Sequence, residues 1–431
     1  MVCLPERRTW CRGRRSDRKM YETGEDIEKV LLVAVEDGSD SLTGAEESLD
    51  ELAELVKTAG AVVVGRLIQN RESIHPGTYL GKGKLAELAE LLEETGASGI
   101  VTDDELAPVQ MKNLEDALSC NVMDRTMVIL DIFAQHAMTG EGKLQVELAQ
   151  LRYRSSRLVG MGRAMSRLGG GIGTRGPGEK KLEVDRRTIR NRIGQLNREL
   201  AEVKKNRDVR REQRLRSAIP VVAIVGYTNA GKSTLLNRLT DAGVLSKDAL
   251  FATLDPTTRN CRLPNGQEVL FTDTVGFIRK LPHHLIDAFR STLEEAKYSD
   301  LILHVVDASN SSADVQMAVV YDTLQKLEIG DRKVVTAMNK QDLVTESGWK
   351  DLRAERTVRI SAKTGDGIPE LLDAISEVLL EGKVYIERVY AYDEITKLQG
   401  IRKYGQLISE EYVADGIAVK AYVPRDRRDL L

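Results

Sequence analysis

Four short polar segments of this sequence have the residue types and the order that nucleotide chemistry requires. The first, "GYTNAGKS", follows the apolar run "VVAIV" and precedes "TLLNRL". In such a strand–loop–helix context, backbone N–H groups wrap phosphates, a lysine neutralises the β and γ phosphates, and a serine ligates Mg²⁺. The predicted phosphate-binding loop comprises Gly226, Tyr227, Thr228, Asn229, Ala230, Gly231, Lys232 and Ser233.

The other three segments also follow apolar runs that are typical of buried strands. Asp273 could hold the Mg²⁺ shell through water, and the Gly276 N–H could meet the γ-phosphate. In "NKQD", Asp342 could accept both guanine N1–H and N2–H₂, a pairing that adenine cannot offer. In open α/β sheets ligands bind at the carboxyl ends of strands, so the four segments predict one GTP site. These three segments contribute Asp273, Thr274, Val275, Gly276, Asn339, Lys340, Asp342, Ser361, Ala362 and Lys363.

The segment "LFATLDPTTR" (250–259) lies where the first switch of such a site belongs. A threonine there usually contacts Mg²⁺ and the γ-phosphate, and Thr253, Thr257 and Thr258 are the candidates. We favour Thr253, with Ser233 as the second Mg²⁺ ligand. The nucleotide contacts expected from this segment are Phe251, Ala252, Thr253, Leu254 and Asp255.

Phe277 follows Gly276 at the position where Ras-type GTPases carry the glutamine that orients the attacking water. A phenyl ring cannot do this, so turnover by the isolated protein should be slow, and Phe277→Ala should leave it largely intact. A partner RNA could order the switches. Alternatively, Asn229 occupies the phosphate-loop position of potassium-activated GTPases, which this loop resembles, and the resemblance implies that K⁺ held there could bridge the phosphates. Asn229 could equally only cap the turn. The predicted catalytic groups are therefore Lys232, Thr253 and Asn229.

Composition limits the remaining possibilities. The chain has 431 residues, 30% charged and 42% hydrophobic, which is typical of a soluble globular protein. Its four cysteines form no CxxC pair, so neither a zinc cage nor a disulfide framework is indicated, and a cytoplasmic setting fits. No apolar run is long enough to span a membrane. The Arg-rich opening could still allow partial membrane association, and whether residues 1–19 are translated stays open because Met20 could start the chain.

Positive charge is concentrated in one segment. Residues 152–216 contain 20 Lys and Arg against 7 Asp and Glu, whereas the rest of the chain is acidic. In this segment and just before it, leucines and isoleucines recur mostly at intervals of three and four, which predicts two long antiparallel helices. The tip between them is "LGGGIGTRGPGE" (168–179), where Pro177 and the glycines should exclude helix. A basic hairpin with a small-residue tip favours contact with folded RNA.

Alternating strand and helix patterns give an α/β fold class with five segments. We expect a disordered basic leader (1–26), an N-terminal α/β domain (27–135) with strands that include "MVILDIF" (127–133), and the helical hairpin (136–217). A P-loop GTPase domain with a doubly wound sheet (218–382) and a small C-terminal α+β domain (383–431) follow. "GTYLGKGK" is read as a turn before a helix rather than as a second phosphate loop.

Several of these segments resemble one family. The four nucleotide segments resemble translation-factor-related GTPases, and "GGGIGTRGPGE", "PGTYLGKGKLAEL" and "DTVGFI" resemble the HflX family over residues 27–382. Lys180 departs from the family pattern at the hairpin tip, and the last 49 residues resemble an extension that some members carry. The resemblance implies a GTPase that binds GTP, GDP and Mg²⁺ and contacts the large ribosomal subunit and its rRNA. It also implies that stalled or hibernating ribosomes are split under stress.

Two functions from other classes are weighed against this one. A tRNA-modifying GTPase would share a potassium site, but those chains usually carry a cysteine near the C-terminus, whereas the last one here is Cys261. A nucleotide-gated RNA-binding scaffold with negligible turnover is the second alternative. We expect a monomer without stable membrane insertion.

Overall fold

A computed structural model defines the fold of most of the chain. It describes residues 28–36, 38, 44–168, 177–215, 219–240, 250–251, 257–281, 296–329, 332–344 and 350–424. The predicted leader, most of the predicted hairpin tip, and Ala252, Thr253, Leu254 and Asp255 lie outside these residues.

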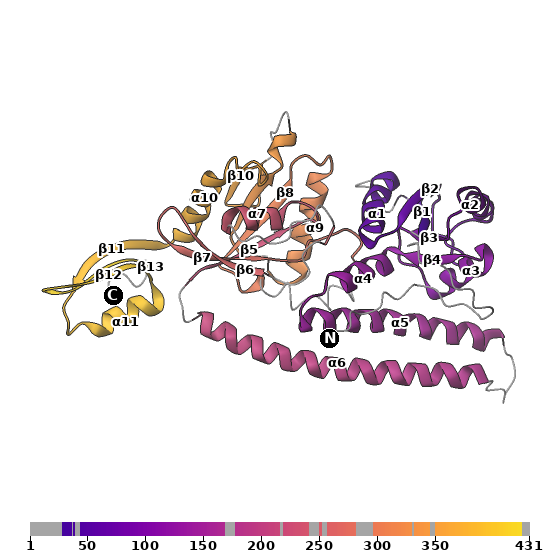
Figure 1. Ribbon diagram of the computed structural model, residues 1–431, viewed down its shortest axis with the longest axis horizontal. Coiled ribbons are helices and arrows are strands. Elements are labelled where there is room, and N and C mark those ends of the chain that lie inside the picture. The colour runs from indigo at the N-terminus through magenta and orange to yellow at the C-terminus, as the bar shows by residue number, and fades with distance from the viewer. Residues whose placement is uncertain are drawn as a thin grey trace, which may run out of the picture.

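The N-terminal unit is a four-stranded parallel sheet in the order β2-β1-β3-β4, covered by helices (Figure 1). The two central strands, β1 and β3, are buried because helices cover both faces of the sheet. The elements are β1 (Lys29–Glu36), α1 (Ala45–Ala59), β2 (Val62–Asn70), α2 (Lys82–Thr95), β3 (Gly99–Thr102), α3 (Pro108–Leu118), β4 (Asn121–Asp124) and α4 (Arg125–His136).

The prediction of a strand at "MVILDIF" is wrong, because these residues belong to α4. Asp124 ends β4 and caps α4, where its Oδ1 accepts the Met127 N–H at 2.9 Å. A short apolar run cannot by itself distinguish a buried strand from a buried helix, and the capping aspartate was the available signal. The turn predicted at "GTYLGKGK" is present: β2 ends at Asn70, and α2 begins at Lys82.

Two long helices form the antiparallel hairpin, α5 (Gly140–Leu168) and α6 (Pro177–Leu215). Pro177 is the first residue of α6, so the prediction that it lies outside the helix is wrong. Proline is tolerated there because the first N–H groups of a helix have no intrahelical partner. Arg192 pairs through two nitrogens with Glu147 at 2.7 and 2.8 Å, and Leu196 is fully buried. The middle of α5 contacts the N-terminal unit, where the Tyr153 hydroxyl lies 2.8 Å from both carboxylate oxygens of Asp124.

The next unit is a six-stranded sheet in the order β10-β9-β8-β5-β7-β6, parallel except for β6. Helices α7 and α10 pack on one face, and α9 packs on the other, so the sheet is doubly wound. The elements are β5 (Val221–Gly226), α7 (Lys232–Thr240), β6 (Thr257–Arg262), β7 (Glu268–Asp273), β8 (Leu301–Asp307), α9 (Ala313–Lys326), β9 (Val334–Asn339), η1 (Gln341–Leu343), β10 (Arg356–Arg359) and α10 (Ile368–Leu380).

A small C-terminal unit follows. One helix packs on a three-stranded antiparallel sheet in the order β11-β13-β12. Its elements are β11 (Lys383–Tyr390), α11 (Ile395–Tyr404), β12 (Gln406–Val413) and β13 (Gly416–Pro424).

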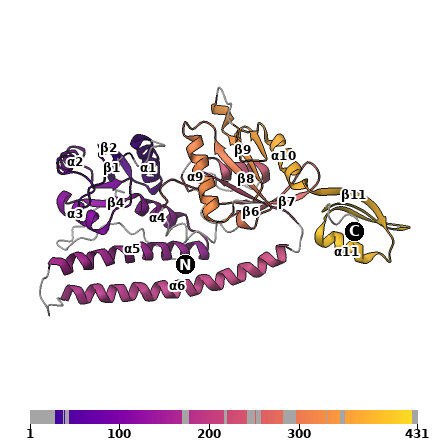
Figure 2. The ribbon, with the colours of Figure 1, turned by 180° about the vertical axis from the view of Figure 1, so that it is seen from behind.

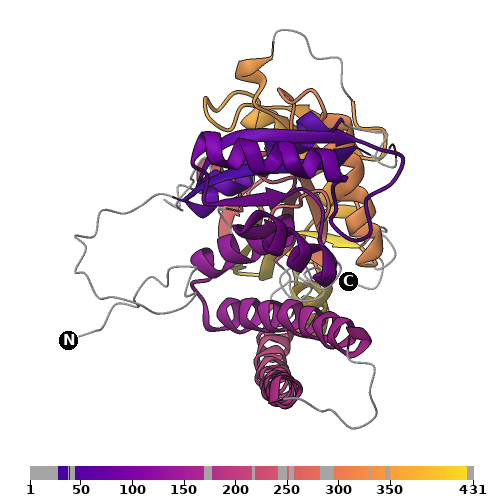
Figure 3. The same cartoon turned by 90° about the vertical axis from the view of Figure 1, so that its right-hand side faces the viewer.

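The units lie in a row along the longest axis, with the C-terminal unit at the end opposite the N-terminal unit (Figures 1 and 2). The hairpin runs beside the N-terminal unit, and α6 leads back towards the six-stranded sheet; the view turned by 90° shows the hairpin on one side of both sheets (Figure 3). The predicted fold class is confirmed. Within the described residues no helix has the length and apolarity to cross a membrane.

Candidate functional site

The loop between β5 and α7 has the geometry of a phosphate cradle. Gly226 ends β5 with φ +156°, and a Cβ there would lie 2.2 Å from the Val305 carbonyl oxygen, so only glycine lets β5 approach β8 this closely. Asn229 adopts the left-handed conformation at φ 58°, and α7 begins at Lys232. The N–H groups at the start of α7 therefore face the loop interior, as anion binding requires.

Lys232 is buried beneath this loop. Its Nζ donates to the Tyr227 carbonyl at 2.8 Å, which holds the ammonium across the loop. Burial lowers the pKa of Lys232 to about 8, although the nearby Asp273 carboxylate opposes the change. An anionic phosphate group would raise this pKa again, because it favours the charged form.

The oxygen atoms expected to serve Mg²⁺ lie together. Ser233 Oγ donates to Asp273 Oδ2 at 2.8 Å, and Asp273 is fully buried at the end of β7. A hydroxyl and a carboxylate are the hard oxygen donors that Mg²⁺ prefers, so the residues present fit the ion. Thr257 and Thr258 lie in β6 opposite Asp273 and Thr272, and the Thr258 hydroxyl lies 2.9 Å from the Thr272 hydroxyl.

The segments predicted to recognise the base meet at the ends of β9 and β10. Asn339 connects them to the phosphate loop, since its Nδ2 donates to the Ala230 carbonyl at 2.8 Å and its Oδ1 accepts the Ala362 N–H at 2.9 Å. Asp342 Oδ1 accepts from the Ser361 hydroxyl at 2.6 Å. That hydrogen bond lowers the pKa of the exposed Asp342 carboxyl, which keeps it an anionic acceptor.

Two lysines flank this region. Lys340 has φ 64° and its Nζ lies 2.7 Å from Asp307 Oδ2 at the end of β8, which fixes the lysine beside the loop. Lys363 is exposed after β10. The structure thus brings together Lys232, Ser233, Asp273, Asn339 and Asp342, which were predicted from three separate sequence segments. They lie at one edge of the sheet, where the loop after β5 meets the ends of β7 and β9.

Phe277 is held against the phosphate loop by its backbone. Its N–H donates to the Gly226 carbonyl at 3.1 Å, and its carbonyl accepts the Thr228 N–H at 2.8 Å. Its side chain is 2% exposed and belongs to an apolar cluster that includes Phe133 of the N-terminal unit. The phenyl ring therefore serves packing between the two units.

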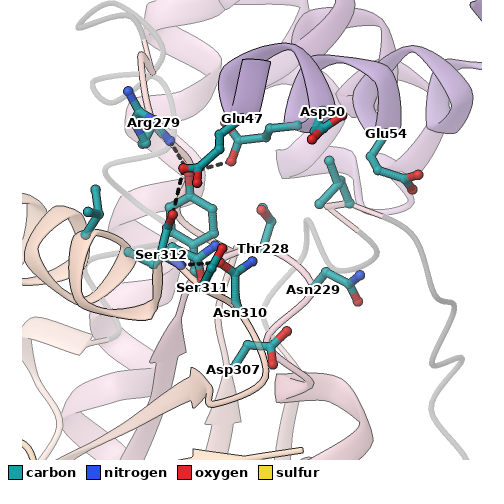
Figure 4. A pocket seen from close by; sticks show the side chains of 15 residues that line it. Glu47, Asp50, Glu54, Thr228, Asn229, Arg279, Asp307, Asn310, Ser311 and Ser312 are labelled. Atoms are coloured by element: carbon teal, nitrogen blue, oxygen red, sulfur yellow. Dashed lines mark hydrogen bonds between the residues drawn. The ribbon is translucent and has the colours of Figure 1, made fainter. Parts of the chain in front are cut away.

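A cavity of about 290 Å³ opens beside the loop, between α1 and the six-stranded sheet (Figure 4). Thr228 and Asn229 line one side, and acidic side chains of α1 line the other (Figure 4). Sequence reasoning did not place the N-terminal unit at this site, because no motif indicates which acidic helix faces the loop. The α1 residues in the wall are Glu47, Asp50, Glu51 and Glu54.

Three families of known proteins match consecutive segments of the chain between residues 46 and 340. A family described as "GTP-binding GTPase N-terminal" matches residues 46–134, and one described as "GTP-binding GTPase Middle Region" matches residues 136–214. A family described as "50S ribosome-binding GTPase" matches residues 221–340.

Two relatives match most of the chain. A GTPase HflX of Lacrimispora saccharolytica is 63% identical over 410 residues, which cover 95% of this chain and 96% of that protein. The GTPase HflX of Escherichia coli is 44% identical and covers 83% of this chain and 84% of that protein. Among solved structures, a GTP-binding protein from Sulfolobus solfataricus in complex with GDP matches 82% of this chain and 99% of its own, with 25% identity and a TM-score of 0.45.

Proposed function

This chain belongs to the HflX family of GTPases and hydrolyses GTP, and from that premise we propose that it acts on the large ribosomal subunit and splits stalled or hibernating ribosomes. The observation that carries the proposal is the hairpin of α5 and α6, which places most of a segment with 20 basic and 7 acidic residues beside the N-terminal unit. A positively charged helical hairpin can bind RNA phosphates along its length by electrostatic attraction. The match of residues 221–340 to the family described as a 50S ribosome-binding GTPase supports the same partner.

Within the nucleotide site we propose distinct roles for the residues brought together. Lys232 would neutralise the β and γ phosphates, Ser233 and Thr253 would hold Mg²⁺, and Asp273 would order its water shell. Mg²⁺ would neutralise charge on the phosphates when bound. Lys232→Ala should abolish GTP binding in a titration, and wild-type turnover by that variant would overturn the assignment.

K⁺ is the second cation that we propose for this site. Asn229 lines the cavity beside the phosphate loop, so its amide oxygen could hold K⁺ next to the phosphates. K⁺ bound there would add positive charge beside the phosphates. Phe277 cannot position the attacking water, because its ring is buried.

Subunit separation tests the proposed function directly. Intact ribosomes are incubated with the protein and GTP, GDP or a non-hydrolysable GTP analogue, and the particles are separated on a sucrose gradient. We expect free large subunits to accumulate with GTP and the protein bound to them, with GDP giving little. Ribosomes that stay intact with every nucleotide would contradict splitting, and a protein that never sediments with large subunits would contradict ribosome binding. We expect the protein to work as a monomer in the cytoplasm.

A further inference from the structure

The third residue of the phosphate loop, Thr228, carries a buried hydroxyl that is not satisfied within the protein. Thr228 is 6% exposed, and its Oγ1 has no hydrogen-bond partner among the residues that the structure describes. A buried hydroxyl without a partner costs about 1–3 kcal/mol, so such a group needs a physical explanation. A molecule that binds at the loop is the natural source of the missing partner.

Thr228 lies beside the two groups that are expected to contact the γ-phosphate. A Cβ on Gly276 would lie 2.9 Å from both Lys232 Nζ and Thr228 Cγ2, and 3.0 Å from Thr228 Cα. The three residues therefore surround one small space after the end of β7. Thr228 also lines the cavity beside the loop, opposite the acidic side chains of α1 (Figure 4). It thus lies between the phosphate cradle and a cavity that is large enough to hold water.

The backbone and the type of side chain hold this hydroxyl in place. The Thr228 N–H donates to the Phe277 carbonyl at 2.8 Å, which fixes the residue within the loop. A β-branched side chain has few accessible χ1 rotamers, so little conformational freedom is lost when its hydroxyl is used. A preorganised hydrogen-bonding group of this kind stabilises a transition state without further rearrangement.

The hydroxyls closest to it in the site are already engaged. The Thr274 hydroxyl donates to the Ile224 carbonyl at 2.8 Å, and the Ser233 hydroxyl donates to Asp273 at 2.8 Å. Of these three hydroxyls, that of Thr228 is the one whose hydrogen-bonding capacity is unused in the described part of the chain. It is therefore the hydroxyl available to the substrate.

From these contacts we propose that Thr228 is a further catalytic residue for GTP hydrolysis, whose hydroxyl donates to the γ-phosphate and accepts a hydrogen bond from the attacking water. It performs the positioning that the buried ring of Phe277 cannot. The water oxygen bonds to the γ phosphorus, the bond from that phosphorus to the bridging oxygen breaks, and GDP leaves with the electron pair. One water proton passes to an oxygen of the released phosphate, so the threonine is unchanged after each turnover. The inference rests on the proposed phosphate-binding role of Lys232 and is independent of the ribosome as partner.

Thr228→Val tests the proposal because it replaces the hydroxyl by a methyl group and keeps the β-branched shape. We expect kcat for GTP without ribosomes to fall roughly 10- to 100-fold, as when one transition-state hydrogen bond is removed. The affinity for GDP should change less than about twofold, because the backbone cradle remains. The melting temperature of the nucleotide-free protein should stay the same or rise, since the variant no longer buries a hydroxyl without a partner.

Two further variants complete the comparison. Thr228→Ser keeps the hydroxyl, so its kcat should stay within roughly threefold of wild type. The matched control is Thr95→Val, which also removes a threonine hydroxyl. The Thr95 hydroxyl is already bonded within α2, to the Leu91 carbonyl at 2.7 Å, so this change should leave kcat and GDP affinity unaltered.

Three results would overturn the proposal alone. The first is an unchanged kcat in Thr228→Val. The second is a kcat in Thr228→Ser as low as in the valine variant, because shape rather than the hydroxyl would then matter. The third is a parallel loss of GDP affinity and melting temperature in Thr228→Val, because the threonine would then only support the fold of the loop. Wild-type turnover by Lys232→Ala would instead remove the whole phosphate-loop assignment, and this proposal with it.

Discussion

At the scale of single residues, we expect guanine selectivity to depend on the carboxylate of Asp342. Asp342→Asn should weaken GTP binding roughly tenfold or more, because two donors of the base lose an anionic acceptor. The fold should remain, since the residue is exposed. A nucleotide titration with GTP and ATP measures this effect, and Asp366→Asn, another exposed aspartate nearby, is the control. Unchanged GTP affinity would remove Asp342 from the site.

Asp103 gives a prediction for acid stability. Burial alone would raise the pKa of its carboxyl, but Arg125 and Lys280 outweigh burial and lower that pKa to about 2. The unfolded chain, with its ordinary value near 3.8, therefore binds the proton more tightly, and the ionised carboxylate stabilises the fold above about pH 4. This contribution, on the order of 2 kcal/mol, should be lost as the pH falls from 4 towards 2.

Melting temperatures of wild type and Asp103→Asn between pH 2 and pH 7 measure this contribution. We expect the variant to melt at a lower temperature at pH 7, because it leaves Arg125 buried with less negative charge, and the difference should shrink below pH 4. The exposed helical pair Asp322–Lys326 provides the control, and Asp322→Asn should shift the melting temperature little at any pH. A difference independent of pH would contradict the ion-pair account.

Asn229 carries the prediction for K⁺. K⁺ should raise GTP turnover above the rate in Na⁺, and Asn229→Ala should erase that difference while leaving the rate in Na⁺ nearly the same. Phe277→Ala should retain basal hydrolysis, whereas loss of a true water-positioning glutamine costs orders of magnitude. Turnover that collapses in a folded Phe277→Ala variant would contradict the interpretation that the ring takes no part in catalysis.

At the scale of elements, the hairpin should bind RNA through charge. Replacement of Arg175 and Lys180 by Glu should weaken co-sedimentation with large subunits, and binding should fall steeply with salt. GTP affinity should hardly change, because the hairpin is separate from the nucleotide site. Replacement of Lys57 and Lys326, exposed lysines outside the hairpin, by Glu provides the control. Binding that ignores both salt and the charge reversal would contradict this role.

Elements were predictable from sequence where periodicity and length agreed. The strands that end in Gly226, Asp273 and Asn339 were located because buried parallel strands have long apolar runs followed by polar motif residues. The helix at Arg125–His136 was missed because its apolar run is too short to separate helix from strand. Thr257 and Thr258 were candidates for the threonine of the first switch that contacts Mg²⁺. Pairing with β7 places both in an edge strand, and that pairing could not be predicted locally because the partner strand follows a turn.

At the scale of the whole molecule, the arrangement of the units could not be predicted. Motifs predict which residues bind nucleotide, because backbone geometry and phosphate chemistry fix their spacing. The contact of Tyr227 with Glu51 joins residues 176 positions apart, and no local pattern encodes it. The same holds for Lys280 and Asp103. The contacts between the N-terminal unit and the nucleotide site are therefore seen only in the structure.

GTP turnover with and without purified large ribosomal subunits tests the central claim most directly. The protein alone should hydrolyse GTP slowly, because the buried ring of Phe277 cannot position the attacking water. Large subunits should raise the rate strongly, since an ordered site removes the cost of assembling it in each turnover. Small subunits at the same concentration are the control. Fast turnover by the protein alone, unchanged by large subunits, would contradict the account.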